Sequence, residues 1–285
     1  MPAFPPPRRT ADTLVFVPTY NEAGTIGALV ERVLALPVRA DVLVVDDGST
    51  DGTLGVLAQA AADPRVGVIR RPGKLGLGSA HKLAWLHARR HGYARLVTLD
   101  ADLSHDPADI PRLLAALDDG AEVAIGSRFA PGGRLDYRGW RRLLSRTANA
   151  LARGMLRLPI REFTTSLRAA RLDRVPAGLV ETIGADGYAF FLVCVVRLAR
   201  QGLAIAEIPI HFRDRSHGVS KIPRLEILRG AKNLLRLAAN RRAADFAPLL
   251  GPDESRCPAC EGPYRVMVAG SRPECLACAG HGRSS

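Results

Sequence analysis

The chain has 285 residues, and 47% of them are hydrophobic, which excludes a largely disordered protein because enough apolar surface exists to form a core. The net charge of +12 lies in one segment, since residues 130–240 carry 20 Lys and Arg against 8 Asp and Glu. Such a segment is typical of proteins that bind nucleic acid, an anionic membrane or a phosphorylated ligand, and it also occurs as a merely solvated surface.

Apolar runs alternate with helical periodicity through the first half of the chain. Residues 1–11 are rich in proline and are expected to form a disordered lead. We then expect strands at 14–17, 41–45, 66–69, 95–99 and 121–125, and helices at 25–36, 54–62, 79–90 and directly after Pro107. Strands and helices that alternate at this spacing predict an α/β fold with a mostly parallel sheet flanked by helices.

The second half of the chain is predicted to be helical and basic. We expect a basic helix with an apolar stripe from Trp140 to Leu158, a helix at 187–201, a strand at 204–210 and an amphipathic helix at 223–240. The stripe of the last helix is expected to include Leu225, Leu228, Leu235 and Ala238. These elements complete a predicted domain at 12–243, followed by a linker and a Cys-rich tail at 244–285.

Polar motifs follow the carboxyl ends of three of the predicted strands. Parallel sheets bind their ligands beyond these carboxyl ends. Asp100 and Asp102 can hold a divalent cation on a diphosphate, although an Asp-x-Asp also occurs as a helix cap. The segment 46–53 is either part of a ligand site or an ordinary turn. Lys74 opens a glycine-spaced loop that enters a helix, whose N-terminus can face a phosphate. Together these motifs predict a pocket for a nucleotide diphosphate.

Four motifs follow one another in the first half of the chain: VPTYNE at 17–22, VDDGSTDG at 45–52, GLGSA at 76–80 and DADLSHDP at 100–107. Together they resemble family 2 glycosyltransferases, and most closely the branch of polyprenol (dolichol) phosphate mannosyltransferases. Further similar segments lie at 126–129, 140–142 and 212–221, so the resemblance spans about residues 13–230. Ser104 stands where the family often has a glutamine.

The resemblance implies a GT-A fold and an inverting, metal-dependent transfer of a sugar from a nucleotide to a lipid phosphate. The donor would be held by Pro18, Tyr20, Glu22, Val45 and Asp47, with Lys74 and Ala101 beside them. Asp100 and Asp102 would bind Mg²⁺ or Mn²⁺ and, with Arg128, form the catalytic set. Donor or acceptor phosphates would be bound by Arg128, Arg142, Arg215 and Lys221. His105, in the metal loop, either approaches the donor or lies behind the site.

The resemblance implies mannose from GDP-mannose as the donor and a polyprenyl or dolichyl monophosphate as the acceptor. Two alternatives use the same core: another nucleotide sugar such as UDP-glucose, or an acceptor that is not a lipid. The sequence also fits a different class of protein: a zinc-ribbon module that binds protein or nucleic acid through the basic segment. We expect no nucleic-acid partner, because this segment has few aromatic side chains on which bases could stack.

The cysteines fall into two groups. Cys257, Cys260, Cys275 and Cys278 form two Cys-x-x-Cys pairs, and this spacing matches a structural zinc site. The alternatives for these four are disorder or redox chemistry. The sequence therefore predicts a small zinc-ribbon-like module in the tail, with four cysteine ligands. Cys194 lies in an apolar run and is expected to be a buried, inert side chain.

The site of action is predicted to be a membrane surface. No run reaches the ~18 apolar residues of a membrane span, and the first residues lack the apolar stretch of a signal peptide. A polyprenyl acceptor nevertheless lies in a bilayer. We therefore expect a cytoplasmic protein, peripheral at the inner face of the cell membrane, which reaches the acceptor through its basic amphipathic stretches at 140–158 and 223–242 or through a membrane-anchored partner.

Overall fold

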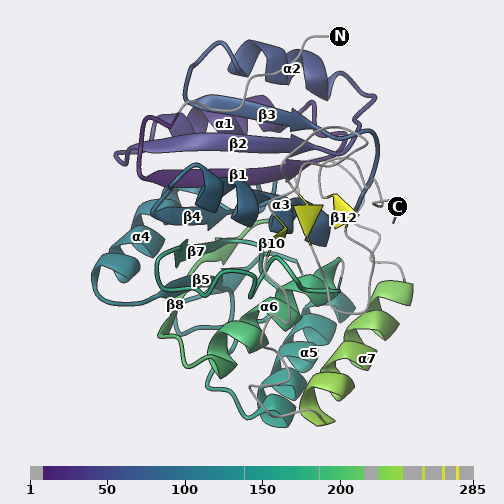
Figure 1. Ribbon diagram of the computed structural model, residues 1–285. Helices are drawn as coiled ribbons and strands as arrows, with labels where there is room; N and C mark the ends of the chain where they lie inside the picture. The colour runs from purple at the N-terminus through teal and green to yellow at the C-terminus, as the bar shows by residue number, and fades with distance from the viewer. Residues whose placement is uncertain are drawn as a thin grey trace, which may run out of the picture.

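A seven-stranded sheet forms the centre of the computed structural model, which describes residues 9–137, 139–185, 187–214 and 224–239 and three short tail strands (Figure 1). Its strands are β1 (Thr13–Thr19), β2 (Ala40–Asp46), β3 (Val66–Arg70), β4 (Arg95–Thr98), β5 (Val123–Ser127), β7 (Arg168–Arg171) and β8 (Ile205–Pro209). Their order is β3-β2-β1-β4-β7-β5-β8. Only β7 runs antiparallel to its neighbours within this sheet, so the predicted mostly parallel α/β sheet is confirmed.

Helices cover both faces of the sheet. They are α1 (Ile26–Leu34), α2 (Thr53–Ala60), α3 (Leu77–Arg90), the 3-10 turn η1 (Pro107–Asp109), α4 (Ile110–Asp118), α5 (Trp140–Leu156), α6 (Tyr188–Arg200) and α7 (Arg224–Ala239). Successive residues of β1 alternate between two buried clusters: Phe16 packs with residues of α3 and α6, whereas Val15 packs with residues of α1 and α4. This alternation explains why β1 is hydrophobic at nearly every position, since both of its faces are buried.

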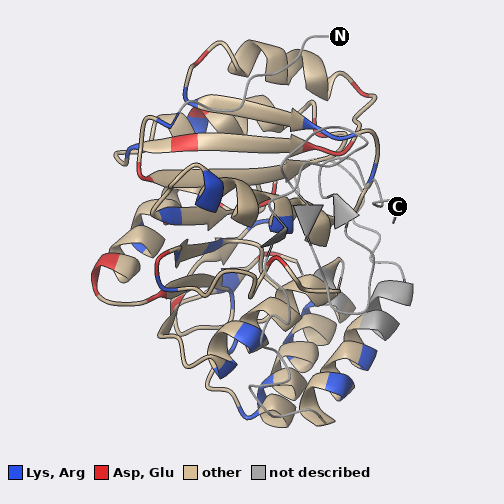
Figure 2. Ribbon diagram, in the orientation of Figure 1, with Lys and Arg blue, Asp and Glu red and all other residues tan. Residues whose placement is uncertain are grey.

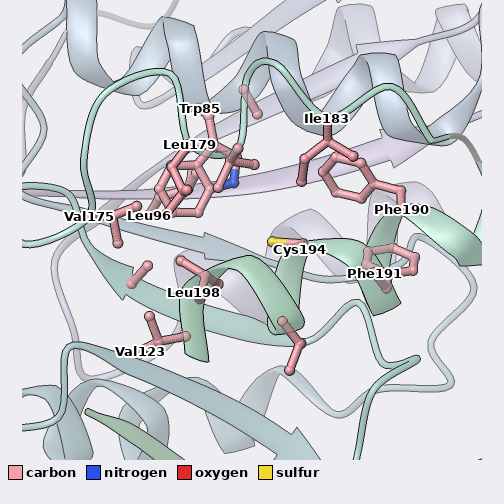
Figure 3. Packing of buried hydrophobic residues seen from close by; sticks show 14 of the residues in the cluster. Trp85, Leu96, Val123, Val175, Leu179, Ile183, Phe190, Phe191, Cys194 and Leu198 are labelled. Carbon is pink, nitrogen blue, oxygen red and sulfur yellow. The ribbon is translucent and has the colours of Figure 1, made fainter. Parts of the chain in front are cut away.

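The larger core surrounds α6. Figure 3 shows Phe190, Phe191 and Cys194 of this helix packed among side chains of the sheet and of α3, including Trp85. Cys194 is a buried free thiol, as predicted. Burial of the whole helix face explains the long apolar run at 188–196, which is core rather than a membrane segment. Among the described helices, none is long and apolar enough to cross a bilayer.

Helix α7 packs against both α6 and α5 (Figure 1). Periodicity predicted an apolar stripe on α5 and on α7 without fixing whether each stripe faces the protein or its surroundings. On α5, Ala152 and Leu156 are buried, whereas Trp140 is 63% exposed and Leu151 54% exposed. The predicted stripe from Trp140 therefore points partly to solvent. On α7, among residues 230–239, Leu237 is buried, while Leu235, a member of the predicted apolar stripe, is 61% exposed.

Two further sheets are small. β6 (Arg134–Leu135) pairs in parallel with β9 (His211–Phe212) next to the end of β5. In the tail, β10 (Pro252–Asp253), β11 (Arg265–Val266) and β12 (Glu274–Cys275) form an antiparallel three-stranded sheet. The rest of the tail, with Cys257, Cys260 and Cys278, lies outside the described residues.

The residues just before β1 are tied to the sheet by a buried carboxylate. Thr10 donates from its backbone N–H and its hydroxyl to the buried carboxylate of Asp41, at 2.8 and 2.5 Å, and the Ala11 N–H donates to the same group. Tyr93 donates to this carboxylate from its hydroxyl, at 3.0 Å. The residues before Arg9 lie outside the described part of the chain.

Candidate active site

Three predicted motifs meet at the carboxyl edge of β1, β2 and β4. The Asp47 N–H donates to the Thr19 carbonyl at 3.0 Å, and the Asn21 N–H donates to Ser49 Oγ at 2.8 Å, so the loops after β1 and β2 interlock. The Leu99 N–H, just after β4, donates to the Phe16 carbonyl at 3.2 Å. In the sheet, β2 lies on one side of β1 and β4 lies on the other, so the order of the strands reverses direction at β1. Open α/β sheets bind ligands at such a switch point.

Asp47 is held in place by a residue that the sequence analysis did not select. The fully buried guanidinium of Arg71 donates to the Asp47 carboxylate, to Ser79 Oγ at 2.6 Å and to the Gly76 carbonyl at 3.1 Å. Arg71 thus joins the end of β2 to the glycine loop before α3. Because a buried ion pair needs this full set of partners, the position of Asp47 is fixed before any ligand arrives.

Other residues that were predicted to bind the nucleotide sugar also lie at this edge, and Val45 is an exception. The Lys74 ammonium lies 4.7 Å from the centre of the Tyr20 ring, which is 40% exposed, so both present themselves to solvent beside the edge. Glu22 accepts from Thr25 Oγ1 at 3.0 Å and begins the turn into α1. Val45 is different, because its side chain is fully buried in the core and contributes packing rather than a surface for a ligand.

The loop after β4, residues 99–106, is predicted to bind a metal and is called the metal loop below; its two carboxylates lie in different surroundings. The Asp100 side chain is 32% exposed, whereas Asp102 is buried and accepts the Ser104 N–H at 3.0 Å. Ala101 between them is buried. Ser104 is fully buried, its carbonyl accepts the Arg213 N–H at 3.0 Å, and its hydroxyl has no partner among the described residues. The loop is therefore anchored to the segment after β9.

His105 lies behind this loop. Its Nε2 is 3.1 Å from Thr165 Oγ1, its ring meets Phe212 edge-on at 5.0 Å, and its Nδ1 lies 3.8 Å from an oxygen of Asp100. Burial lowers the pKa of His105 to about 4, although the nearby Asp102 carboxylate acts in the opposite direction. The imidazole is therefore neutral at pH 7, and it supports the loop from inside the protein.

Arg128 follows β5 and is locked by a buried carboxylate. Its Nε and Nη2 donate to the two oxygens of Glu162 at 2.7 and 2.8 Å, a bidentate pair, and Nη2 also reaches Thr164 Oγ1 at 2.8 Å. Burial opposes ionisation of Glu162, yet the Arg128 guanidinium and the Thr164 donors hold its pKa below the usual value. Only Nη1, which donates to the Tyr137 hydroxyl at 3.2 Å, lies away from this carboxylate.

The predicted phosphate-binding residues are placed only in part. Arg128 and Arg142, in the first turn of α5, line one groove of about 1200 Å³. Arg215 and Lys221 lie outside the described residues. The structure thus brings Asp47, the metal loop and Arg128 to one edge of the sheet and adds Arg142 beside it.

Sequence reasoning missed Arg71 and Glu162 and left His105 undecided. Glu162 could have been noticed in the sequence, since it is the one carboxylate in the segment 159–172. No motif spacing, however, predicts that it pairs with Arg128. Arg71 follows β3 beside another arginine, so nothing in the sequence marks it as fully buried. Both act through contacts between distant segments, which motif spacing does not show.

Comparison with known proteins agrees with this geometry. The family model of glycosyl transferase family 2 matches residues 14–174. The chain is 43% identical over 219 residues to the polyprenol monophosphomannose synthase of Mycolicibacterium smegmatis, covering 75% of this chain and 82% of that protein. It is 40% identical to the undecaprenyl-phosphate mannosyltransferase of Micrococcus luteus, covering 73% and 86%.

Among solved structures, glucosyl-3-phosphoglycerate synthase from Mycobacterium tuberculosis, in complex with Mn²⁺, UDP-glucose and phosphoglyceric acid, is similar with a TM-score of 0.58. The match covers 80% of this chain and 79% of that one at 23% identity, and it shows a shared GT-A-like fold. The family match excludes the view of the protein as only a binding module. The chain belongs to glycosyl transferase family 2 and is a glycosyltransferase.

Proposed function

We propose that the enzyme transfers mannose from GDP-mannose to a polyprenyl monophosphate with inversion at the sugar. The observation that carries this proposal is the identity of 43% and 40% to two enzymes named for mannose transfer to polyprenol or undecaprenyl phosphate. The polar edge formed by the ends of β1, β2 and β4 supports it, because it supplies the groups that a nucleotide diphosphate needs.

The donor would lie across the edge of β1 and β2. Asp47, prepositioned by Arg71, is suited to accept hydrogen bonds from the ribose or the base, with Glu22 on the neighbouring loop. Tyr20 and Lys74 offer an exposed ring and an ammonium group to the base or the diphosphate. Pro18, Ala101 and the backbone of Val45 would shape the floor of this site.

Asp100 and Asp102 fit Mg²⁺ or Mn²⁺ by the chemistry of their donors, since carboxylate oxygens are the hard ligands that these ions prefer. Within the described residues, no three His, Cys, Asp or Glu side chains gather as a complete metal site. Further ligands would therefore come from the diphosphate and from water, as is usual for Mg²⁺. When bound, the ion would neutralise charge on the departing diphosphate.

The acceptor phosphate needs no base from the protein. A phosphate monoester has a second pKa near 6 and is largely a dianion at pH 7. One of its oxygens attacks C1 of mannose, the bond from C1 to the β-phosphate oxygen breaks, and GDP leaves with the electron pair. Arg128 and Arg142, together with Arg215 and Lys221, would offset the repulsion between the two anions and fix the line of attack.

A screen of donors against acceptors tests the proposed function. Purified enzyme would be offered GDP-mannose or UDP-glucose, each with a polyprenyl phosphate or with phosphoglyceric acid, and products would be separated by phase partition and identified by mass. We expect mannosyl lipid from GDP-mannose alone. Glucosyl lipid would support the alternative donor, and a water-soluble glycoside would support the alternative acceptor.

We further propose that the enzyme works at a membrane surface through α5 and α7. The large apolar side chains Trp140, Leu143 and Leu151 of α5 and Leu235 of α7 are between 54% and 69% exposed. Figure 2 shows Lys and Arg on the same two helices. Exposed apolar side chains beside basic residues are typical of surfaces that enter the interface of an anionic bilayer.

Removing the apolar side chains should weaken membrane binding. For the triple variant Trp140→Ser/Leu143→Ser/Leu151→Ser we expect at least tenfold weaker co-sedimentation with anionic vesicles, because each side chain gains about 1.5–3 kcal/mol when fully buried. Binding of the unaltered enzyme should also weaken as salt is added, since screening reduces the attraction of its arginines. Vesicle binding unaffected by either change would contradict the membrane role of α5.

For the tail we propose a structural Zn²⁺ site made of Cys257, Cys260, Cys275 and Cys278. The pairing of β11 with β12, with Arg265 opposite Cys275, supports this, because a hairpin between two Cys-x-x-Cys pairs brings them together. We expect one zinc per chain by elemental analysis, and less than half of that in Cys275→Ser. A chain purified without zinc, and unable to bind it after reduction, would overturn the site.

A further inference from the structure

The groove beside Arg128 is lined on its polar side almost entirely by arginine. On α5 these are Arg142, Arg146 and Arg153; Arg157 at its C-cap, Arg134 and Arg161 also line the groove with Arg128. The steps of four and seven residues place Arg142, Arg146 and Arg153 on one face of the helix, over an axial length of about 16 Å, and Arg157 follows at the C-cap. The groove is therefore much longer than a single phosphate requires.

Most of this charge is not neutralised by carboxylates of the described residues. Of the arginines in the groove, Arg128 pairs with Glu162, and Arg161 lies 3.7 Å from Glu207. Within the described part of the chain, Arg146, Arg153 and Arg157 have no carboxylate in ion-pair distance. Asp136, the one carboxylate among the lining residues that the structure describes, lies 2.6 Å from His211 Nε2. Like charges four residues apart destabilise a helix, so a bound anion would relieve this repulsion.

The far end of the groove is too distant to serve the reacting phosphates. Arg153 lies 11 residues beyond Arg142, or about 16 Å along the axis of α5, and Arg157 lies beyond it at the C-cap of the helix. A phosphate held between Arg128 and Arg142 therefore leaves this end of the groove free for a separate anion. Guanidinium groups recognise phosphate through paired, parallel hydrogen bonds, which makes phosphate the best-matched anion.

We propose that this end of the groove, around Arg153 and Arg157, binds the headgroup phosphate of an anionic phospholipid distinct from the acceptor. This inference rests on the proposed reaction at a membrane surface. The same helix exposes Trp140, Leu143 and Leu151 away from its arginine face. When these apolar side chains enter the acyl boundary, the long arginine side chains reach the level of the headgroups. The bound lipid would hold α5, and with it Arg142, at the surface where the acceptor phosphate lies.

Two matched double variants test the proposal. Arg153→Gln/Arg157→Gln removes two charges from the groove, and Arg90→Gln/Arg174→Gln removes two exposed charges at the opposite edge of the sheet. Binding would be measured by co-sedimentation with phosphatidylcholine vesicles that contain phosphatidylglycerol, at fixed ionic strength. We expect the groove variant to bind at least tenfold more weakly and the control less than twofold. Equal weakening in both, or none in either, would overturn the site.

Further measurements separate this proposal from its alternatives. Both double variants should transfer mannose normally to a short-chain, water-soluble prenyl phosphate, which also reports that they are folded. Arg153→Lys/Arg157→Lys, which retains the charge, should keep most of the vesicle binding. A contrary result is that inorganic phosphate binds to the groove without vesicles while the groove variant binds vesicles as well as the unaltered enzyme does. In that case the groove binds a soluble anion, and the lipid proposal is wrong. Absence of any mannosyl transfer by the unaltered enzyme would contradict the proposed function but not the vesicle result.

Discussion

Asp102→Asn should lose about a thousandfold in the rate of sugar transfer, because several kcal/mol of charge stabilisation at the diphosphate depend on this carboxylate. The substitution keeps an oxygen that can accept the Ser104 N–H, so the loop should retain its shape. The rate would be measured as GDP release and as lipid-linked mannose at saturating Mg²⁺. Urea unfolding should show an unchanged midpoint.

Asp63→Asn is the matched control. This carboxylate pairs with Arg65 at the other edge of the sheet, before β3, and its removal should leave the transfer rate within twofold. A near-normal rate for Asp102→Asn would show that the loop after β4 does not hold the metal. A thousandfold loss in both variants would show that the assay reports damage to the fold instead.

Arg128→Leu should destabilise the folded protein by about 3–5 kcal/mol, since it leaves the carboxylate of Glu162 buried without its partner. The Glu162 side chain is fully buried, and Arg128 is only 9% exposed. The free energy of unfolding would be measured by urea titration at pH 7. Transfer should be lost at the same time, because Arg128 is placed at the groove beside the metal loop.

A second substitution separates the two effects of losing Arg128. In Arg128→Leu/Glu162→Gln the buried charge is gone, while the amide oxygen can still accept from Thr164, so most of the stability should return. The transfer rate should stay low. If the rate recovers with the stability, Arg128 is only a structural partner of Glu162 and its place in the catalytic set is wrong.

Sequence patterns predicted six of the seven strands of the central sheet, among them the three whose loops we propose bind the donor. β1, β2 and β4 are apolar runs followed directly by polar motifs, and such runs form strands for local reasons. The strand β7 was not predicted, because Arg168-Ala-Ala-Arg171 has no apolar run. It is a strand because β4 and β5 pair with it on both sides. Buried Arg168 donates to the carbonyls of Thr165, Phe163 and Phe191.

The orientation of α5 shows a second limit of sequence reasoning. Periodicity identified an apolar stripe that begins at Trp140, but it could not tell whether the stripe faces the protein. In the structure Asn149 is among the buried residues, and it accepts the Phe163 N–H at 2.8 Å. Asn149 lies on the inward side of the helix with Ala152 and Leu156, whereas Leu143 and Leu151 face outward. The same orientation directs the arginines into the groove.

The anomeric configuration of the product tests the central claim most directly. GDP-mannose carries an α-linked sugar, so a single attack by a lipid phosphate on C1 gives a β-mannosyl phosphate. Phosphorus and proton NMR would follow the reaction of purified enzyme with GDP-mannose and a short-chain polyprenyl phosphate. We predict one β-mannosyl phosphate formed for each GDP released. An α-linked product, or GDP released without a mannosyl lipid, would contradict direct transfer to the acceptor phosphate.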